Sequence, residues 1–202
     1  AFMRLEKIKH IPVVDFAGFS DFHISVNYRA DVIRNHFGSG SALGVNVSYI
    51  EEDRPLGTAG PLAQLAAGND GPLLVMNGDI LSKVDPLQMI DFHRESGAAA
   101  TMAVRSYEVQ VPYGVVDISD NEILGLREKP VSQHFINAGI YVLGRAALDL
   151  VPQNQAFDMP QLFDACRAND MRTLACPIEK HWVDIGQMDG YRRANADFAS
   201  IL

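Results

Sequence analysis

An apolar run that ends in a carboxylate constrains the fold of this chain more than any other feature. Residues 73–76 read Leu-Leu-Val-Met, and Asn77, Gly78 and Asp79 follow directly. A continuous apolar run of this length is typical of a central parallel strand buried on both faces. In open α/β sheets, ligands bind beyond the carboxyl ends of such strands. The run therefore predicts a sheet with a ligand site at Asp79.

A glycine-containing turn lies shortly before this strand. Gly57 and Gly60 let the backbone approach a flat ligand because they lack a Cβ atom, and Thr58 can cap a helix over residues 59–67. Asp79 suits Mg²⁺, which commonly takes one or two protein carboxylates. Taken alone, each segment has an ordinary explanation, a connecting turn or an aspartate that caps the next helix. Together they predict a nucleotide and metal site.

Hydrophobic periodicity predicts alternating strands and helices, followed by antiparallel strands joined by the turn signal Asp120-Asn121. Asp158 is predicted to cap one of the helices. The predicted strands cover residues 22–27, 45–50, 73–76, 98–104, 115–118, 123–127, 135–143 and 173–177, and the predicted helices cover 30–37, 59–67, 86–96, 159–168 and 188–198. The fold class is therefore α/β: a Rossmann-like, three-layer α/β/α arrangement with a mixed, mostly parallel central sheet and a small antiparallel β insertion. We expect a single domain over residues 1–202.

The composition excludes several classes of function. The 202 residues carry a formal net charge of -8, and no basic run could neutralise a nucleic-acid backbone. No apolar stretch approaches the roughly 18 residues that a membrane span needs, and no signal segment opens the chain. Cys166 and Cys176 have a spacing that fits no metal motif and favour reduced, inert thiols. We therefore expect a cytoplasmic protein that binds neither nucleic acid nor membranes, and we leave a homo-oligomer open.

Two polar dipeptides flank the predicted hairpin. Gly114 follows Tyr113 at the start of a strand, where exposed backbone groups can bond a polar ligand, although an ordinary strand start explains it equally. Glu128 and Lys129 follow the end of a strand. The glutamate can accept hydrogen bonds from sugar hydroxyls and the lysine can supply a charge for a phosphate, whereas a solvated surface pair is the common alternative.

Two further polar positions interrupt apolar strands. Asn137 and Gly139 lie inside an otherwise apolar strand, where a polar group is costly unless it is bonded. Asp184 ends a short strand that begins at Trp182. It either caps a following helix or completes a two-aspartate Mg²⁺ site with Asp79.

These segments resemble the sugar-phosphate nucleotidyltransferases, which make nucleotide sugars from an NTP and a sugar 1-phosphate. The resemblance covers about residues 18–198 and follows the family's sequence order. It is greatest for the mannose-1-phosphate guanylyltransferase-like branch, in particular for bacterial relatives that carry CBS domains before the transferase. The segments that carry it are residues 26–28, 55–62, 75–79, 110–116, 128–130, 137–141, 157–160 and 182–186.

The resemblance implies a role for each predicted site residue. Asp79 and Asp184 would bind Mg²⁺ and, with Lys129 at the sugar phosphate, would form the catalytic group. Gly57 and Thr58 would contact the base. The sugar would be held by Tyr113, Gly114, Glu128, Asn137 and Gly139.

Glu52 gives a separate indication of the base. Guanine presents the N1–H and N2–H donors side by side, and one carboxylate can accept both. GTP is therefore favoured over nucleotides of thymine or uracil. Glu51 or Asp53 would take this role if the register differs, and a solvated acidic loop is the alternative.

One part of the family's pattern has no counterpart in this chain. The family's glycine-rich loop, with its arginine and lysine that grip the triphosphate, is missing, and residues 1–17 resemble only loosely a helix that follows it. The resemblance thus implies that the first strand and the triphosphate-binding loop are absent, through shortening, omitted disordered residues or degeneration.

We expect nucleotidyl transfer from an NTP to a sugar 1-phosphate, with the chain as given weak or inactive. One alternative is a transferase-like domain that has lost catalysis and serves a regulatory or assembly role. A glycosyltransferase ranks below it, because such enzymes normally show an Asp-X-Asp motif where residues 77–79 offer one carboxylate.

Overall fold

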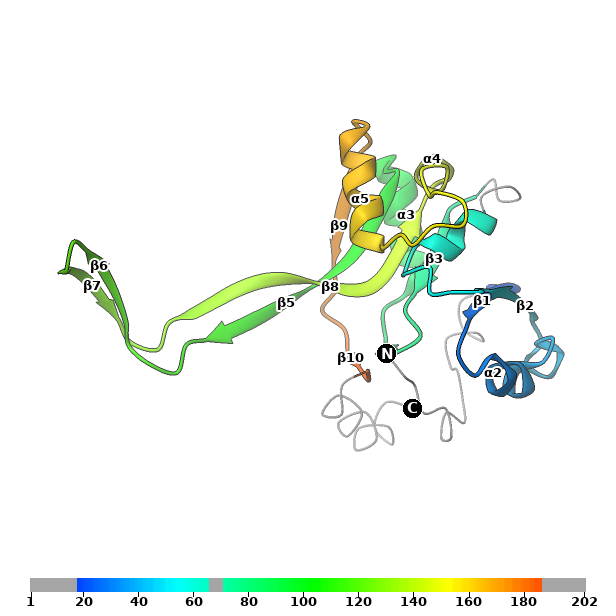
Figure 1. Cartoon of the computed structure of the whole chain (residues 1–202), viewed down its shortest axis with the longest axis horizontal. Coiled ribbons are helices and arrows are strands. Elements are labelled where there is room, and N and C mark those ends of the chain that lie inside the picture. Colours follow the sequence, from blue (N-terminus) through cyan, green and yellow to red (C-terminus); the bar gives the residue numbers. More distant parts are fainter. Residues whose placement is uncertain (1–17, 66–70, 187–202) are drawn as a thin grey trace.

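The computed structural model describes residues 18–65 and 71–186. Its main sheet has the strand order β3-β8-β5-β9 (Figure 1). These strands are β3 (Leu73–Met76), β5 (Ala100–Gln110), β8 (Val131–Leu143) and β9 (Thr173–Pro177). Three of them, β3, β5 and β9, run in one direction, and β8 runs against them. The predicted α/β class with a mixed, mostly parallel sheet is confirmed.

Two smaller pairs of strands accompany this sheet, one parallel and one antiparallel. β1 (Asp21–Val26) and β2 (Asn46–Glu51) pair in parallel. β4 (Ile80–Ser82) and β10 (Trp182–Asp184) pair antiparallel. The sequence predicted every one of these strands except β4, which is only three residues long and has no alternating pattern to reveal it.

Helices cover both faces of the main sheet. Neighbouring residues of a strand point to opposite faces, and β8 carries apolar residues on both, so each face buries its apolar side chains under helices. On one face, Tyr141 and Leu143 of β8 pack in a buried cluster with α5 and η3. On the other face, Ile140 and Val142 pack against α3. The helices are α2 (Ala30–Phe37), the 3-10 helices η2 (Ser41–Leu43) and η3 (Gly60–Gln64), α3 (Pro86–Ser96), α4 (Arg145–Leu148) and α5 (Met159–Ala168). None of the helices in the described ranges is long and apolar enough to cross a membrane.

Helices α3 and α5 begin where the sequence predicts because their first residues carry capping groups. The Asp85 side chain accepts hydrogen bonds from two N–H groups of the first turn of α3, and Gly97 ends that helix with φ of 61°. Asp158 and Gln161 form a reciprocal capping box at the start of α5. The predicted cap at Asp158 is confirmed.

Two predicted elements differ from the structure. β3 is an edge strand of the four-stranded sheet, it pairs antiparallel with β8, and its four residues are only half buried. An apolar run indicates burial but not the direction of the neighbouring strand, so the prediction of a central parallel strand was wrong. The helix predicted over residues 59–67 is the short η3, which has no side-chain cap. The helix predicted over 188–198 lies outside the described residues.

A two-stranded arm projects from the main sheet (Figure 1). β5 and β8 are longer than predicted and stay paired beyond the body, out to the pair Gln110–Val131. The arm ends in the hairpin of β6 (Val115–Ser119) and β7 (Glu122–Arg127). Asp120 and Asn121 form its turn, both with positive φ. The predicted antiparallel insertion is therefore present, but it stands away from the layers of the body.

The buried histidine of α3 should make stability depend on pH. His93 is 4% exposed and shares a 2.9 Å hydrogen bond with Thr101. Burial lowers the pKa of His93, and the nearby charge of Arg94 lowers it further. The unfolded chain therefore binds more protons at acidic pH, and we expect the free energy of unfolding to fall as the pH drops below about 6.5. Urea unfolding at several pH values measures this slope, and a His93→Gln variant should lose part of it. An identical slope in the variant would contradict the assignment.

Candidate functional site

Two aspartates far apart in the sequence lie next to each other. Asp79 sits in the turn before β4, and Asp184 ends β10, the strand that pairs with β4. The N–H of Ile185 donates to the Asp79 carbonyl at 2.8 Å. An added Cβ atom on Gly186 would lie 2.8 Å from Asp79 Oδ2 and 3.0 Å from Asp184 Oδ1. The two carboxylates therefore face the same small space.

The chemistry of this pair fits Mg²⁺. The two carboxylate oxygens are separated by no more than the sum of the two distances, about 5.8 Å. Two oxygens bound to one Mg²⁺ at about 2.1 Å lie within roughly 4 Å of each other, so modest side-chain rotation brings both to one ion. Both aspartates are only half buried, which leaves positions for water and phosphate oxygens. The described ranges contain no group of three or more His, Cys, Asp or Glu side chains that could hold a metal ion, so the pair would need water or phosphate oxygens to complete the ligands.

A bulge in β8 places Asn137 and Gly139 beside the aspartate turn. The β5–β8 ladder shifts register at this point. Gly139 has φ of 71°, and its carbonyl accepts a hydrogen bond from the Asn77 N–H at 2.9 Å. Asn137 Oδ1 accepts from the Gly139 N–H, and its Nδ2 donates to the Tyr141 hydroxyl at 2.8 Å. The protein itself supplies one partner to each end of the Asn137 amide, and a sugar contact there stays a prediction.

Substitution of Gly139 tests how firmly the bulge holds the aspartate turn. An added Cβ atom would lie 2.9 Å from Asn77 Nδ2 in a backbone conformation that disfavours side chains. We expect Gly139→Ala to lower the free energy of unfolding by about 1–3 kcal/mol. The matched control is Gly78→Ala, because a Cβ atom on Gly78 meets nothing within 4 Å. Chemical denaturation compares them, and equal stabilities of the two variants would refute the strain.

The Gly57-Thr58 turn is fastened to the start of α5. Asp158 Oδ1 accepts from the Thr58 N–H at 2.9 Å and from its hydroxyl at 3.3 Å. Thr58 Oγ1 accepts in turn from the Met159 N–H at 2.8 Å. The predicted cap by Thr58 of its own helix is therefore wrong, because the hydroxyl caps α5 instead. Sequence spacing gives no signal for a contact across 100 residues.

The glycines of this turn face protein rather than open space. Gly57 has φ of 76°, and an added Cβ atom would lie 2.6 Å from Asp158 Oδ1. An added Cβ atom on Gly60 would lie 2.7 Å from the Gln155 carbonyl oxygen. Close packing on the segment before α5 thus explains both glycines without a ligand. A base contact by Gly57 and Thr58 stays a prediction.

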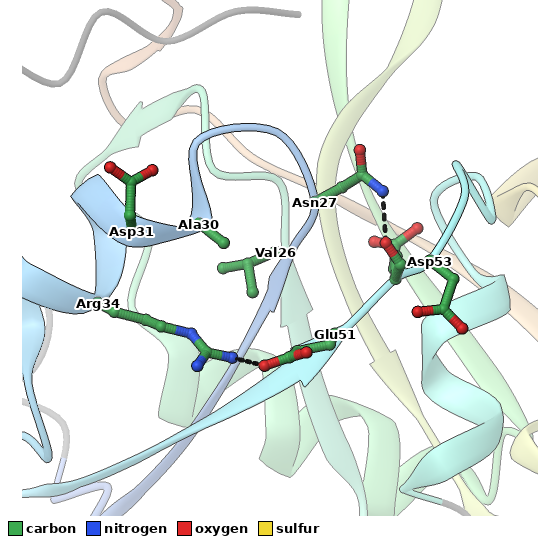
Figure 2. A pocket seen from close by; sticks show the side chains of 8 residues that line it. Val26, Asn27, Ala30, Asp31, Arg34, Glu51 and Asp53 are labelled. Atoms are coloured by element: carbon green, nitrogen blue, oxygen red, sulfur yellow. Dashed lines mark hydrogen bonds and ion pairs between the residues drawn. The ribbon is translucent and has the colours of Figure 1, made fainter.

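A pocket of about 320 Å³ opens at the carboxyl ends of the parallel strands β1 and β2 (Figure 2). Arg34 of α2 is directed at Glu51 and forms an ion pair with it, and Arg34 also lies over the Tyr49 ring. Asn27 Nδ2 donates to the Glu52 carbonyl at 2.5 Å. The pocket is lined by Val26, Asn27, Ala30, Asp31, Arg34, Glu51, Glu52 and Asp53.

Glu52 lines this pocket, and each of its carboxylate oxygens already accepts one hydrogen bond from the protein. Its Oε1 accepts from the Ser25 hydroxyl at 2.6 Å, and its Oε2 accepts from the Leu56 N–H at 2.8 Å. Each carboxylate oxygen has a second lone pair, so both can accept another donor. Glu51, by contrast, is paired with Arg34. The position of Glu52 is compatible with the predicted contact to guanine.

The other predicted sugar and phosphate residues lie on the arm. Tyr113 and Gly114 precede β6, and Glu128 and Lys129 follow β7, where the arm meets the hairpin (Figure 1). An added Cβ atom on Gly114 would lie 3.2 Å from Glu128 Oε2, so these two residues face each other. At about 3.3 Å per residue, residues 131–137 of β8 carry this group roughly 20 Å from Asn137. The structure therefore divides the predicted site in two. The arm carries Tyr113, Gly114, Glu128 and Lys129, and the body of the fold carries the other predicted residues, namely Glu52, Gly57, Thr58, Asp79, Asn137, Gly139 and Asp184.

Comparison with known proteins gives the family. The sequence profile of the Nucleotidyl transferase family matches residues 9–201. The mannose-1-phosphate guanylyltransferase of Mycobacterium tuberculosis is 32% identical over 189 residues, which cover 90% of this chain and 52% of that enzyme. The UTP–glucose-1-phosphate uridylyltransferase of Synechocystis is 30% identical over 210 residues, covering 91% and 54%. This chain belongs to the nucleotidyl transferase family, and the predicted family is confirmed. It spans about half the length of the curated relatives it matches.

Solved structures share the fold. HddC from Yersinia pseudotuberculosis aligns with a TM-score of 0.70 at 22% identity, covering 92% of this chain and 82% of HddC. A putative glucose-1-phosphate thymidylyltransferase from Bacillus anthracis aligns at 0.69 and 21% identity, covering 91% and 78%. A complex of HddC with GMP-PN aligns at 0.64 and 22% identity, covering 87% and 77%. These likenesses support the α/β architecture described above.

Proposed function

We propose that this protein transfers a nucleotidyl group from an NTP, with GTP preferred, to a sugar 1-phosphate. The products are a nucleotide sugar and pyrophosphate. The observation that carries the proposal is the convergence of Asp79 and Asp184 on the space beside Gly186. Membership of the family and the names of the matching relatives, a guanylyltransferase and a uridylyltransferase, support the class of reaction.

The reaction needs little acid or base chemistry, because a sugar phosphate is already an anionic nucleophile. Its oxygen forms a bond to the α-phosphorus of the NTP, and the bond from that phosphorus to pyrophosphate breaks on the opposite side. Positioning and electrostatic stabilisation therefore supply most of the rate. When bound, Mg²⁺ would offset the negative charge that gathers on the phosphate oxygens.

The two aspartates and the backbone around them each have a task in this proposal. Asp79 and Asp184 would hold the cation beside Gly186, whose N–H donates to Asp184 Oδ1 at 2.8 Å. The bulge at Gly139 fixes the backbone of Asn77, which precedes Asp79. Lys129 and the sugar contacts of the arm are assigned by resemblance alone, so the proposal does not depend on them.

Release of pyrophosphate tests the reaction. The informative result is how the turnover of the 202-residue chain depends on its substrates. Pyrophosphate should appear only when Mg²⁺, an NTP and a sugar 1-phosphate are all present. Nucleotide binding without any release would instead support a degenerate regulatory or assembly domain. Release that ignores the sugar phosphate would contradict the proposal.

The preference for GTP should depend on Glu52. We expect Glu52→Gln to lower the ratio of kcat/KM for GTP to that for UTP by about tenfold, because a neutral amide cannot accept both guanine donors. The matched control is Asp31→Asn, a change of the same kind on the same pocket, which should leave the ratio unchanged. Circular dichroism checks that the loss of the Ser25 hydrogen bond leaves the fold intact. An unchanged ratio in Glu52→Gln would remove Glu52 from base recognition.

A further inference from the structure

Strand β10, which carries Asp184, lies outside the main sheet. It pairs with β4 through three residue pairs, and these two strands form a sheet of their own. A two-stranded sheet is marginally stable by itself, because it has no third element to hold it in place. Contacts of side chains therefore have to fix β10 relative to the rest of the fold.

Hydrogen bonds at Trp182 fasten β10 to two strands of the main sheet. The Trp182 Nε1–H donates to the Ala138 carbonyl of β8 at 2.7 Å. Arg105 of β5 donates from Nη1 to the Trp182 carbonyl at 2.6 Å, and its guanidinium carbon lies 5.7 Å from the centroid of the indole ring. Arg105 therefore contacts both the backbone and the ring of Trp182.

The anchor for β10 is the same bulge of β8 that holds the Asp79 turn. The Gly139 carbonyl accepts from the Asn77 N–H, two residues before Asp79. The preceding carbonyl, that of Ala138, accepts from Trp182. Adjacent carbonyls of β8 thus anchor the two segments that carry the aspartates.

Arg105 also brings a positive charge close to the proposed cation site. Trp182 and Asp184 are two residues apart on β10, so their side chains lie on the same face and their Cα atoms are about 7 Å apart. A guanidinium in this neighbourhood repels a divalent cation. Any benefit of Arg105 to the site therefore comes through the strand that it holds.

We propose that Arg105 is a positioning residue for Asp184. By holding the Trp182 carbonyl, it keeps the end of β10 in place, and the Asp184 carboxylate stays beside that of Asp79. Two carboxylates bind one cation best when both are already directed at it, because ordering them on binding lowers the affinity. The inference rests on the proposed function, which gives Asp184 its role.

Binding of Mn²⁺ to the 202-residue chain tests this role. Arg105→Met keeps most of the side-chain length but removes the charge and the donors, and we expect it to weaken Mn²⁺ binding by about tenfold. Loss of the repelling charge alone would strengthen binding, so the direction of the change separates positioning from electrostatics. Arg105→Lys keeps the charge and an N–H donor without the planar guanidinium, and its affinity should lie between those of the wild type and Arg105→Met.

Arg172→Met is the matched control. Arg172 also donates from Nη1 to a backbone carbonyl, that of Ser96, at 2.7 Å. It precedes β9, whose first residue pairs with the first residue of β5, so it lies at the end of the sheet opposite to the aspartates. We expect Arg172→Met to bind Mn²⁺ like the wild type.

The fluorescence of Trp182 gives a second readout that needs no metal. Trp182 is the only tryptophan among the 202 residues, so quenching by acrylamide reports on this position alone. Arg105→Met should raise the quenching constant of the metal-free chain, because the ring loses a neighbour and the strand loses an anchor. Arg172→Met should leave it unchanged. Far-UV circular dichroism shows whether each variant keeps its fold.

Three results would overturn the role of Arg105 while the cation site stands. They are Mn²⁺ binding by Arg105→Met that is as tight as in the wild type or tighter, equal losses in Arg105→Met and Arg172→Met, and unchanged acrylamide quenching in Arg105→Met. A wild-type chain that binds no Mn²⁺ would instead remove the proposed cation site, and the role of Arg105 with it. The wild-type titration thus separates the two kinds of failure.

Discussion

Replacing Asp79 with asparagine should reduce pyrophosphate release by about 100-fold or more. The change is nearly isosteric, but a neutral amide binds a hard divalent cation far more weakly than a carboxylate does. Because Asp184 faces the same space, Asp184→Asn should have an effect of similar size. The measurement is kcat with saturating NTP and sugar 1-phosphate, followed through the pyrophosphate produced.

The control for this experiment is Asp91→Asn. Asp91 is exposed on α3, away from the turn that carries Asp79, and its variant should keep wild-type kcat. Wild-type turnover in Asp79→Asn would remove this aspartate from the metal site. A loss in Asp79→Asn accompanied by full activity in Asp184→Asn would show that the two carboxylates do not act as a pair.

Truncating Leu162 should give a large loss of stability. Its side chain is fully buried on α5, within the cluster that joins this helix to β8. Leu162→Ala removes buried methyl groups and leaves a cavity, so we expect the free energy of unfolding to fall by about 2–5 kcal/mol. The measurement is urea unfolding followed by circular dichroism.

Leu87→Ala is the matched comparison, because the Leu87 side chain on α3 is 45% exposed. It should cost about 1 kcal/mol or less. Equal losses in the two variants would show that the α5 face is not the core of the fold. The Leu162→Ala variant should also loosen the Thr58 turn, because Asp158 at the start of α5 holds that turn.

Local features of the fold could be predicted because nearby residues determine them. The cap at Asp158 and the hairpin turn at Asp120-Asn121 depend on residues within one turn of each other. Pairing between distant segments could not be predicted in this way. The apolar run of β3 fits a central or an edge strand equally, and only the antiparallel partner β8 decides between them.

The same distinction applies to the candidate site. Asp79 and Asp184 could be selected as carboxylates at strand ends, but their convergence depends on the pairing of β4 with β10, and β4 had no sequence signal. Thr58 was selected as a cap, yet its partner Asp158 lies 100 residues away. The placement of Glu128 and Lys129 on a projecting arm depends on how far the β5–β8 ladder extends, which periodicity does not fix.

The central claim is that Asp79 and Asp184 hold one divalent cation between them. The most direct measurement is a titration with Mn²⁺, as a paramagnetic substitute for Mg²⁺, in which electron paramagnetic resonance counts the free ion. We predict one bound ion per chain for the wild type and for Asp91→Asn, and at least about tenfold weaker binding in both Asp79→Asn and Asp184→Asn. Unchanged Mn²⁺ binding in the two single variants would contradict the account.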